Sequence, residues 1–248
     1  MQVDSTLKAA VELRNISLSF DNQPLFKNLY FELPTEKITA IVGASGCGKS
    51  TLLKLINGLV PPDDGEIHIC GQQVSHSDQA DWRRHMGYAV QQIGLFPHLN
   101  AADNVILLAQ LEQWSSLSIQ ERLDYLADKM GLDQAILSRF PHELSGGQAQ
   151  RVGLCRAMML KPPILLLDEA FSAVDPITRM DIYQYFLRLQ ETEPRTVLLI
   201  THDMREAVKL SDYIAVMQQG EIVQFAPVEQ VVSQPATDYV ARLVKEHI

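Results

Sequence analysis

The first sixty residues change from a strand-like hydrophobic pattern to a helical one. Residues 11–16 and 37–42 alternate apolar and polar positions between turn signals, as β-strands do. Residues 52–59 instead place leucine and isoleucine at spacings of three and four, which predicts a helix with one buried face. The prolines at 61 and 62 are expected to end that helix.

The rest of the chain predicts a helical segment and then further strands. Residues 101–160 are expected to be mostly helical, with one amphipathic helix over 117–130. The runs 164–167 and 196–200 are uniformly apolar, which is typical of a parallel sheet covered on both faces. A helix over 204–211, a hairpin over 213–225 and a short helical tail are expected to follow. This order predicts an α/β core interrupted by a helical insertion.

Composition narrows the class of protein without identifying it. The 248 residues fit one large domain, and a hydrophobic fraction of 46% argues against a disordered or fibrous chain. The net charge of −9 argues against a nucleic-acid partner. No apolar run approaches the roughly 20 residues of a membrane-spanning helix, and no secretory signal is expected. Cys47, Cys70 and Cys155 are far apart, which predicts neither a disulfide framework nor a zinc site and suits a reducing cytoplasm.

The clearest chemical signal follows the strand at 37–42. Residues 43–51 match the pattern G-x-x-x-x-G-K-[ST], with an apolar strand before it and an amphipathic helix after it. The glycines let backbone N–H groups turn toward an anion, and the helix N-terminus adds partial positive charge. Lys49 would bind the β- and γ-phosphates, and the Ser50 hydroxyl would bind Mg²⁺. The predicted ATP-binding residues of this phosphate loop are Gly43, Ser45, Gly46, Cys47, Gly48, Lys49, Ser50 and Thr51.

Two acidic residues follow directly after the apolar strand at 164–167. A buried strand has no structural need for carboxylates at its end. Asp168 is therefore predicted to bind Mg²⁺, and Glu169 to act as the base that polarises an attacking water molecule.

A third element, Leu-Ser-Gly-Gly-Gln at 144–148, completes the pattern. Ser145 is a good N-cap for the following helix, and Gly146 and Gly147 would let a phosphate approach the backbone. Together with the phosphate loop and the two carboxylates, this segment resembles the ATP-binding cassette (ABC) family over essentially the whole chain. The resemblance implies an α/β fold: a P-loop NTPase (RecA-like) core with an N-terminal antiparallel β subdomain and an inserted α-helical subdomain.

The resemblance also implies boundaries and residue roles within a single ABC ATPase domain over 1–248. Gln91 stands at the family's glutamine that contacts Mg²⁺ and the attacking water, and His202 at its switch histidine, which joins Glu169 as a catalytic residue. Phe20 stands where an aromatic ring stacks on adenine. The residues expected to contact ATP from a second subunit are Ser145, Gly146, Gly147, Gln148 and Asp175. The implied parts are a nucleotide-binding core with β subdomain (1–93 and 162–226), a helical subdomain (94–161) and a C-terminal helical tail (227–248).

A cassette of this kind works with other subunits. The resemblance implies ATP and Mg²⁺ as cofactors and a head-to-tail dimer with a second copy, because one chain carries only one of each element. It implies a place on the cytoplasmic face of the cell (inner) membrane, with integral membrane permease subunits as partners and a substrate-binding protein as an indirect one. Phe96 and Leu99 would then be apolar contacts to the permease, or else ordinary core residues.

A narrower resemblance points to a solute. The segments 91–98, 140–144, 175–179 and 220–224 resemble the glycine betaine/choline (quaternary amine, osmoprotectant) importers. Two kinds of alternative stay open: a cassette for polar amino acids, another small solute or lipid, and a soluble ABC ATPase that acts outside transport. The chain shows no heptad run between the phosphate loop and residues 144–148, which disfavours the coiled-coil relatives that act on DNA.

Overall fold

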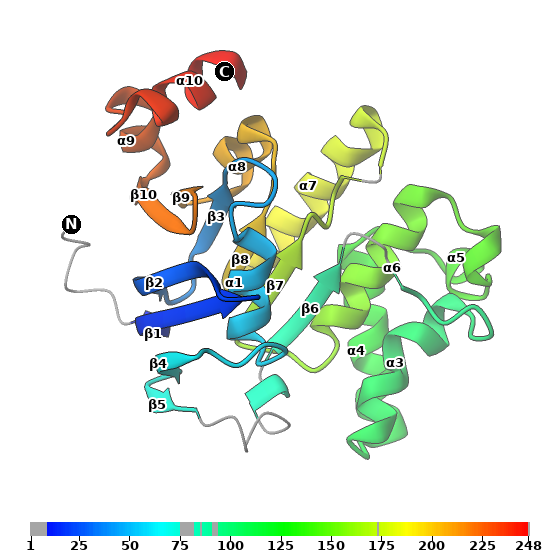
Figure 1. Cartoon of the computed structure of the whole chain (residues 1–248). Coiled ribbons are helices and arrows are strands. Elements are labelled where there is room, and N and C mark those ends of the chain that lie inside the picture. Colours follow the sequence, from blue (N-terminus) through cyan, green and yellow to red (C-terminus); the bar gives the residue numbers. More distant parts are fainter. Residues whose placement is uncertain (1–8, 75–81, 85, 91–93, 173, 248) are drawn as a thin grey trace. The chain divides into compact units, whose positions relative to one another are not determined.

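The computed structural model describes residues 9–74, 82–84, 86–90, 94–172 and 174–247. The chain forms two compact units, and each is described by itself (Figure 1). The first unit comprises residues 1–86 and 195–248, and the second comprises residues 87–194. These units group residues by their contacts, so the subdomain boundaries that the resemblance implies stay a prediction.

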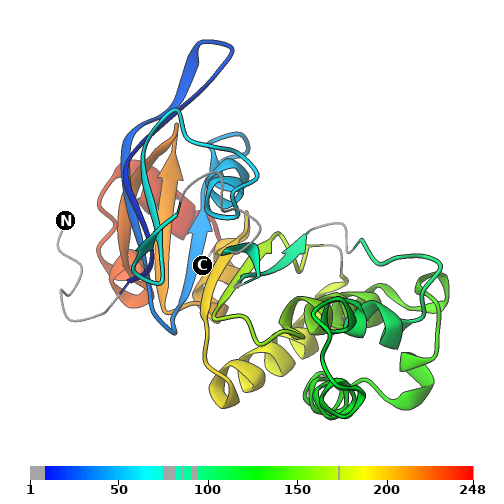
Figure 2. The ribbon, with the colours of Figure 1, turned by 90° about the horizontal axis from the view of Figure 1, so that it is seen from below.

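The first unit contains an antiparallel sheet with the order β2-β1-β4-β5. Its strands are β1 (Ala9–Phe20), β2 (Gln23–Pro34), β4 (Asp64–Ile69) and β5 (Gln72–Gln73). The predicted strand at 11–16 is confirmed as part of β1. Asp21 and Asn22 both have positive φ, 50° and 61°, which suits the tight turn of a β-hairpin between β1 and β2. Figure 2 shows the long hairpin that results.

The first unit also contains a second set of strands, which includes the predicted strand at 37–42 and the predicted apolar run at 196–200. They are β3 (Ile38–Val42), β8 (Thr196–Ile200), β9 (Tyr213–Gln218) and β10 (Glu221–Pro227). Their order is β10-β9-β3-β8, and β3 runs parallel to both of its neighbours. Every residue of β3 and β8 is buried, as a parallel sheet covered on both faces requires. β9 and β10 form the hairpin predicted over 213–225.

The helix after the phosphate loop is shorter than its sequence pattern suggests. Helix α1 (Lys49–Ile56) ends before Leu59, which was expected on its apolar face and is instead 50% exposed. Gly58 has a φ of +66° and its N–H donates to the Leu55 carbonyl at 3.0 Å, while the Leu59 N–H donates to the Lys54 carbonyl at 2.8 Å. This pair of bonds is a Schellman motif, so the glycine ends the helix and not the later prolines.

Three helices complete the described part of the first unit after residue 200. They are α8 (Met204–Leu210), α9 (Val228–Ser233) and α10 (Asp238–His247), as the predicted helix and helical tail require. The segment that leads into α10 is held by the buried Gln224 side chain. Its Nε2 donates to the Gln234 carbonyl at 3.0 Å, and its Oε1 accepts from the Ala236 N–H at 2.8 Å. Gln224 therefore anchors the segment that precedes α10.

The second unit is mainly helical, as predicted for residues 101–160. Its elements are β6 (Met86–Val90), α3 (Ala101–Leu111), α4 (Ser116–Lys129), α5 (Gln134–Leu137), η2 (Pro141–Glu143), α6 (Gly146–Met158), β7 (Ile164–Asp168) and α7 (Pro176–Thr192). Asn100, Ser115 and Asp133 cap the N-termini of α3, α4 and α5 by accepting a backbone N–H. Polar capping residues thus set the starts of helices that the hydrophobic pattern placed only approximately.

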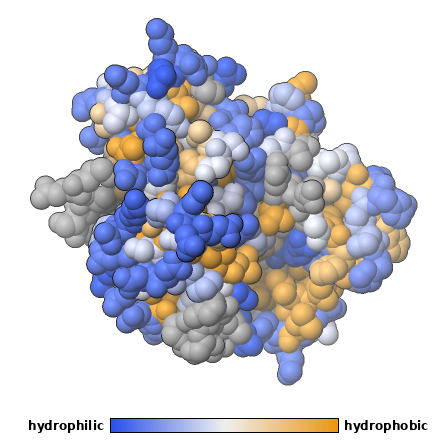
Figure 3. Space-filling view, in the orientation of Figure 1, coloured by the Kyte–Doolittle hydropathy of each residue, from blue (hydrophilic) through white to orange (hydrophobic). Residues whose placement is uncertain are grey.

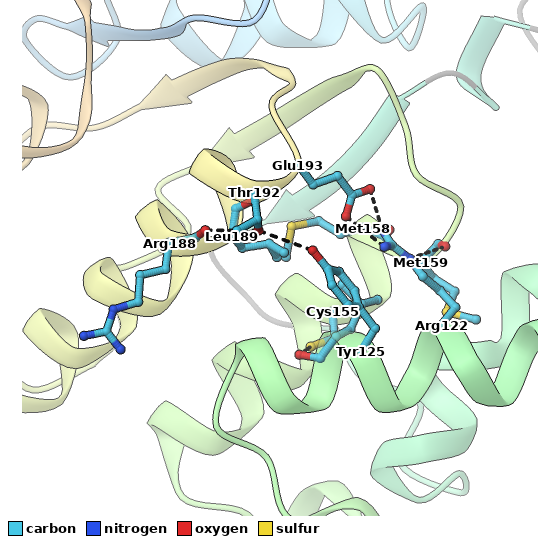
Figure 4. Close-up of polar contacts among 10 residues, drawn as sticks. Arg122, Tyr125, Cys155, Met158, Met159, Arg188, Leu189, Thr192 and Glu193 are labelled. Atoms are coloured by element: carbon cyan, nitrogen blue, oxygen red, sulfur yellow. Dashed lines mark hydrogen bonds and ion pairs between the residues drawn. The ribbon is translucent and has the colours of Figure 1, made fainter.

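A buried arginine joins three helices of the second unit (Figure 4). Arg122 of α4 donates from Nη1 and Nη2 to the two carboxylate oxygens of Glu193, at 2.8 and 2.9 Å. The same guanidinium donates to the Met158 carbonyl at 2.8 Å, at the end of α6. Nearby, burial raises the pKa of the Cys155 thiol to about 12, so this cysteine stays protonated. All three cysteines are free, as predicted.

Glu193→Ala is expected to lower the free energy of unfolding by about 2–3 kcal/mol, because it leaves the Arg122 charge buried without its carboxylate. The estimate is at the lower end for a buried pair, since Glu193 is one quarter exposed. Urea unfolding checks the value against Glu191→Ala, which removes an exposed carboxylate from the last turn of α7, two residues before Glu193. Equal unfolding midpoints for the two variants would contradict this role of the ion pair.

Candidate functional site

The phosphate loop connects β3 to α1 in the first unit. Gly46 and Gly48 have φ values of +77° and +112°, where residues with side chains are strained. A Cβ on Gly48, the N-cap of α1, would lie 2.9 Å from the ring of the buried Phe26. Ser45, Gly46 and Ser50 are exposed along the loop, and Cys47 is buried below it. The strand, glycine turn and helix therefore have the order that a phosphate-binding loop needs.

The ammonium group of Lys49 lies inside this loop. Its Nζ donates to the carbonyl oxygens of Gly43 at 2.8 Å and Ala44 at 2.9 Å, and the residue is 7% exposed. Carbonyl dipoles hold a cation less strongly than anionic oxygens do. A phosphate group that enters the loop would consequently find a positive charge already in place.

A turn far along the chain supports the loop from the side. The Gly220 N–H, in the turn between β9 and β10, donates to the Cys47 carbonyl at 3.0 Å. A Cβ on Gly220 would lie 1.8 Å from the Leu25 carbonyl oxygen, and one on Gly43 would lie 2.2 Å from the Met217 carbonyl oxygen. Both positions therefore require glycine. The sequence predicted this hairpin but gave no sign that it contacts the loop.

His202 and the first residues of the loop share one cavity in the first unit. The cavity has a volume of about 240 Å³, and His202, Gly43, Ala44 and Ser45 are among the residues that line it. His202 is exposed at its edge, after β8. His202 and Ser45, which the sequence predicted from separate motifs, therefore line the same cavity.

Phe20 lies at the tip of the β1–β2 hairpin and is 49% exposed. It is therefore not a core residue of the strand. An exposed ring is what stacking on a base requires, although its contact with a nucleotide stays a prediction.

In the second unit, the two predicted carboxylates follow the buried part of β7. Asp168 is the last residue of that strand, and burial together with the Asp168 charge raises the pKa of Tyr88 on the neighbouring β6 to about 12. Glu169 has a φ of +49°, an unusual conformation for a residue with a side chain. The Ser172 N–H and Oγ both donate to its carbonyl oxygen, at 3.1 and 2.8 Å. Such local strain often marks functional positions.

The segment around Ser145 has the geometry that its sequence predicted. The Ser145 Oγ accepts from the Gln148 N–H at 3.2 Å, and the Gln148 Oε1 accepts from the Ser145 N–H at 3.0 Å. This capping box fixes the N-terminus of α6. Ser145 and Gly146 are exposed, so their backbone is open to a ligand, while Gly147 is buried.

Asp175 plays the same capping role for α7. Its Oδ1 accepts from the Thr178 N–H at 3.0 Å, and the hydrogen bonds to Thr178 lower the pKa of the Asp175 carboxyl. A Cβ on Gly147 would lie 2.3 Å from the Thr178 side chain. The two segments predicted to contact ATP from a second subunit are therefore neighbours in the second unit. Gln91, the remaining predicted catalytic residue, lies outside the described residues.

Comparison with known proteins identifies the class. The family model described as "ABC transporter" matches residues 26–172, and this chain belongs to that family. The ATP-binding cassette MJ0796, solved as a dimer in a post-hydrolysis state bound to ADP and Pi, superposes with a TM-score of 0.77. The two sequences are 29% identical, over 88% of this chain and 98% of that one. The cbiO1 protein from Clostridium perfringens, 22% identical with a TM-score of 0.85, shares the fold. The predicted cassette fold is confirmed.

Among named proteins, the chain is similar to ATP-binding proteins of osmoprotectant uptake. It is 40% identical over 230 residues to the glycine betaine uptake system ATP-binding protein YehX of Escherichia coli (strain K12), covering 93% of this chain and 75% of that protein. It is 38% identical over 233 residues to the choline transport ATP-binding protein OpuBA of Bacillus subtilis (strain 168), covering 94% of this chain and 61% of that protein. The chain thus spans less than two thirds of OpuBA. The narrower resemblance to this group is confirmed at the level of sequence.

Proposed function

We propose that this chain is the ATP-hydrolysing subunit of an ABC importer for quaternary amines such as glycine betaine or choline. The observation that carries the proposal is the Lys49 ammonium held inside a glycine-rich loop between a buried strand and a helix. The solute class is supported by the similarity to YehX and OpuBA. A sulfate/thiosulfate import ATP-binding protein, CysA of Pseudomonas syringae pv. tomato (strain ATCC BAA-871 / DC3000), is 37% identical over 235 residues, which keeps other solutes open.

The proposed reaction is transfer of the γ-phosphoryl group of ATP to water. Backbone N–H groups of the loop and the Lys49 ammonium bind the β- and γ-phosphates and stabilise the charge that develops on them. Glu169 accepts the proton of the attacking water, and ADP leaves as the P–O bond breaks. His202, which lines the same cavity as the start of the loop, contacts the γ-phosphate. Phe20 stacks on the adenine ring.

The residues that the motifs assign to Mg²⁺ have side chains that suit this ion. The Ser50 hydroxyl and the Asp168 carboxylate are hard oxygen ligands, which Mg²⁺ prefers, and Gln91 would add an amide oxygen. Among the described residues, no group of three or more His, Cys, Asp or Glu could hold a metal. A Mg²⁺ site does not need such a cluster, because this ion is usually bound by one or two protein ligands together with the phosphates of the substrate. When bound, Mg²⁺ would neutralise phosphate charge.

The dimer is proposed as head to tail. The exposed Ser145–Gly146 backbone and Asp175 would contact ATP held by the phosphate loop of a second copy. MJ0796, a relative of known structure, was solved as a dimer. ATP then links two surfaces, and its hydrolysis removes the link and lets the dimer reopen.

The permease is proposed to bind the helical part of the second unit. Figure 3 shows apolar surface gathered over α3 and α4. Leu111 on α3 and Leu117 on α4 are 68% and 69% exposed, and Phe96 is also exposed, whereas Leu99 is half-buried. Exposed apolar residues that gather in this way are typical of protein contact sites. Among the described residues, no helix is both long and apolar enough to span a bilayer. We place the chain on the cytoplasmic face of the membrane, attached through the permease.

The test is ATP hydrolysis by the chain reconstituted in vesicles with its co-purified membrane partner. Glycine betaine, choline, carnitine, sulfate and amino acids are presented in turn on the cognate binding protein. We expect only a quaternary amine to stimulate ATP hydrolysis. The binding protein and the permease recognise the solute, and the permease then changes the activity of the cassette. Stimulation only by another solute would retain the importer and reject this substrate class. If no membrane partner co-purifies, a soluble ATPase becomes the better hypothesis.

A further inference from the structure

We propose that Tyr239 on helix α10 is a positioning residue of the phosphate loop, acting on Lys49 through the peptide group between Gly43 and Ala44. The proposal rests on the proposed function, since it assumes that residues 43–51 bind the phosphates of ATP. It gives the C-terminal helix a part in nucleotide binding that no motif in the sequence assigns.

One peptide group is held from both sides. The Ala44 N–H donates to the Tyr239 hydroxyl at 2.9 Å, and the Gly43 carbonyl accepts from the Lys49 Nζ at 2.8 Å. The N–H and the carbonyl belong to the same planar peptide, in which they point in opposite directions. The hydroxyl of Tyr239 therefore fixes the direction of the carbonyl that holds the ammonium.

The orientation of the Gly43–Ala44 peptide group needs a constraint from another part of the chain. Gly43 carries no side chain, and the Met217 carbonyl oxygen occupies the place that a Cβ would take. A glycine peptide rotates more freely than one flanked by side chains. Tyr239 supplies a constraint that the glycine cannot supply itself.

Helix α10 is placed firmly enough to supply this constraint. Val240 is fully buried, and α10 contacts both α8 and α9. Gln224 holds the segment that precedes the helix through its two bonds to Gln234 and Ala236. Tyr239 and Leu243 also line the 240 Å³ cavity, together with His202 and the first residues of the loop. A displacement of α10 would consequently change the surroundings of both the loop and His202.

The decisive variant is Tyr239→Phe, which keeps the ring and removes only the hydroxyl. We expect the Kd and KM for ATP to rise about two- to tenfold, the effect of one backbone hydrogen bond. The kcat at saturating ATP should stay within about twofold, because bound ATP itself selects the productive loop conformation. Amide hydrogen exchange in residues 43–48 should become faster. Tyr30→Phe is the matched control, since its hydroxyl donates to Glu32 within β2 and the residue is exposed.

The possible results distinguish failure of the Tyr239 role from failure of the proposed ATP-binding function. If Tyr239→Phe matches Tyr30→Phe in Kd and KM, or lowers kcat and thermal stability with KM unchanged, the positioning role is wrong and the contact serves only helix packing. Lys49→Ala is measured in parallel. If that variant binds ATP as the unaltered chain does, the loop is not the phosphate site and the proposed function fails first.

Discussion

Glu169→Gln is expected to keep ATP bound and to slow its hydrolysis by at least about 10²-fold, the lower end for loss of a general base. Glutamine has nearly the same shape as glutamate, so the strained turn at this position, closed by the two bonds from Ser172, should persist. The amide cannot accept a proton from water, however. The loss should therefore appear in kcat, with the Kd for ATP unchanged.

The measurement is single-turnover hydrolysis together with equilibrium binding of ATP. Glu121→Gln, an exposed glutamate on α4 of the same unit, is the matched control and should hydrolyse ATP as the unaltered chain does. A further expectation is that the variant accumulates as a dimer with ATP, because the nucleotide that links the two copies is not consumed. Turnover by Glu169→Gln equal to that of Glu121→Gln would remove Glu169 from the reaction.

Lys49→Ala is expected to weaken the binding of ATP, the step that precedes hydrolysis. The variant removes a buried ammonium that would exchange two carbonyl partners for phosphate oxygens. Each hydrogen bond to a charged group contributes about 1.5–3 kcal/mol, so ATP affinity should fall by about 10²-fold or more. Lys54→Ala, an exposed lysine in the last turn of the same helix, provides the control for loss of positive charge.

Isothermal titration with ATP checks this expectation, with thermal unfolding to verify that the variant is folded. The two variants should differ in kind. Lys49→Ala raises the Kd, and Glu169→Gln lowers kcat. Equal ATP affinity in Lys49→Ala and Lys54→Ala would be incompatible with a phosphate-binding role for the loop.

The strands and most helices of this chain could be predicted because their signals are local. The predicted strand at 37–42 and the apolar run at 196–200 are β3 and β8 of a covered parallel sheet, and the serine before two glycines is the N-cap of α6. The apolar spacing continues to Leu59 and therefore predicted too long a helix. It does not register the left-handed conformation of Gly58, which ends α1. Helix ends depend on single capping residues, which a hydrophobic period does not register.

The candidate site also combines features that have a local sequence signal with contacts that have none. The loop at 43–51, the carboxylates after β7 and the capping box at Ser145 each keep their chemistry within a short segment, so spacing and residue type were enough to find them. The bonds from Gly220 to Cys47 and from Tyr239 to Ala44 were not visible in the sequence. Neither a glycine in a hairpin nor a tyrosine in an amphipathic tail is unusual by itself.

The sequence by itself determined the class of protein, the phosphate loop and the residues expected to do the chemistry, because motif and period are properties of neighbouring residues. Only the tertiary structure decided which distant groups hold that loop in shape. Tyr239 lies 195 residues from Ala44 along the chain, and Arg122 lies 71 from Glu193. Such contacts form when packed elements bring backbone and side-chain groups together, and this leaves no periodic trace in the sequence.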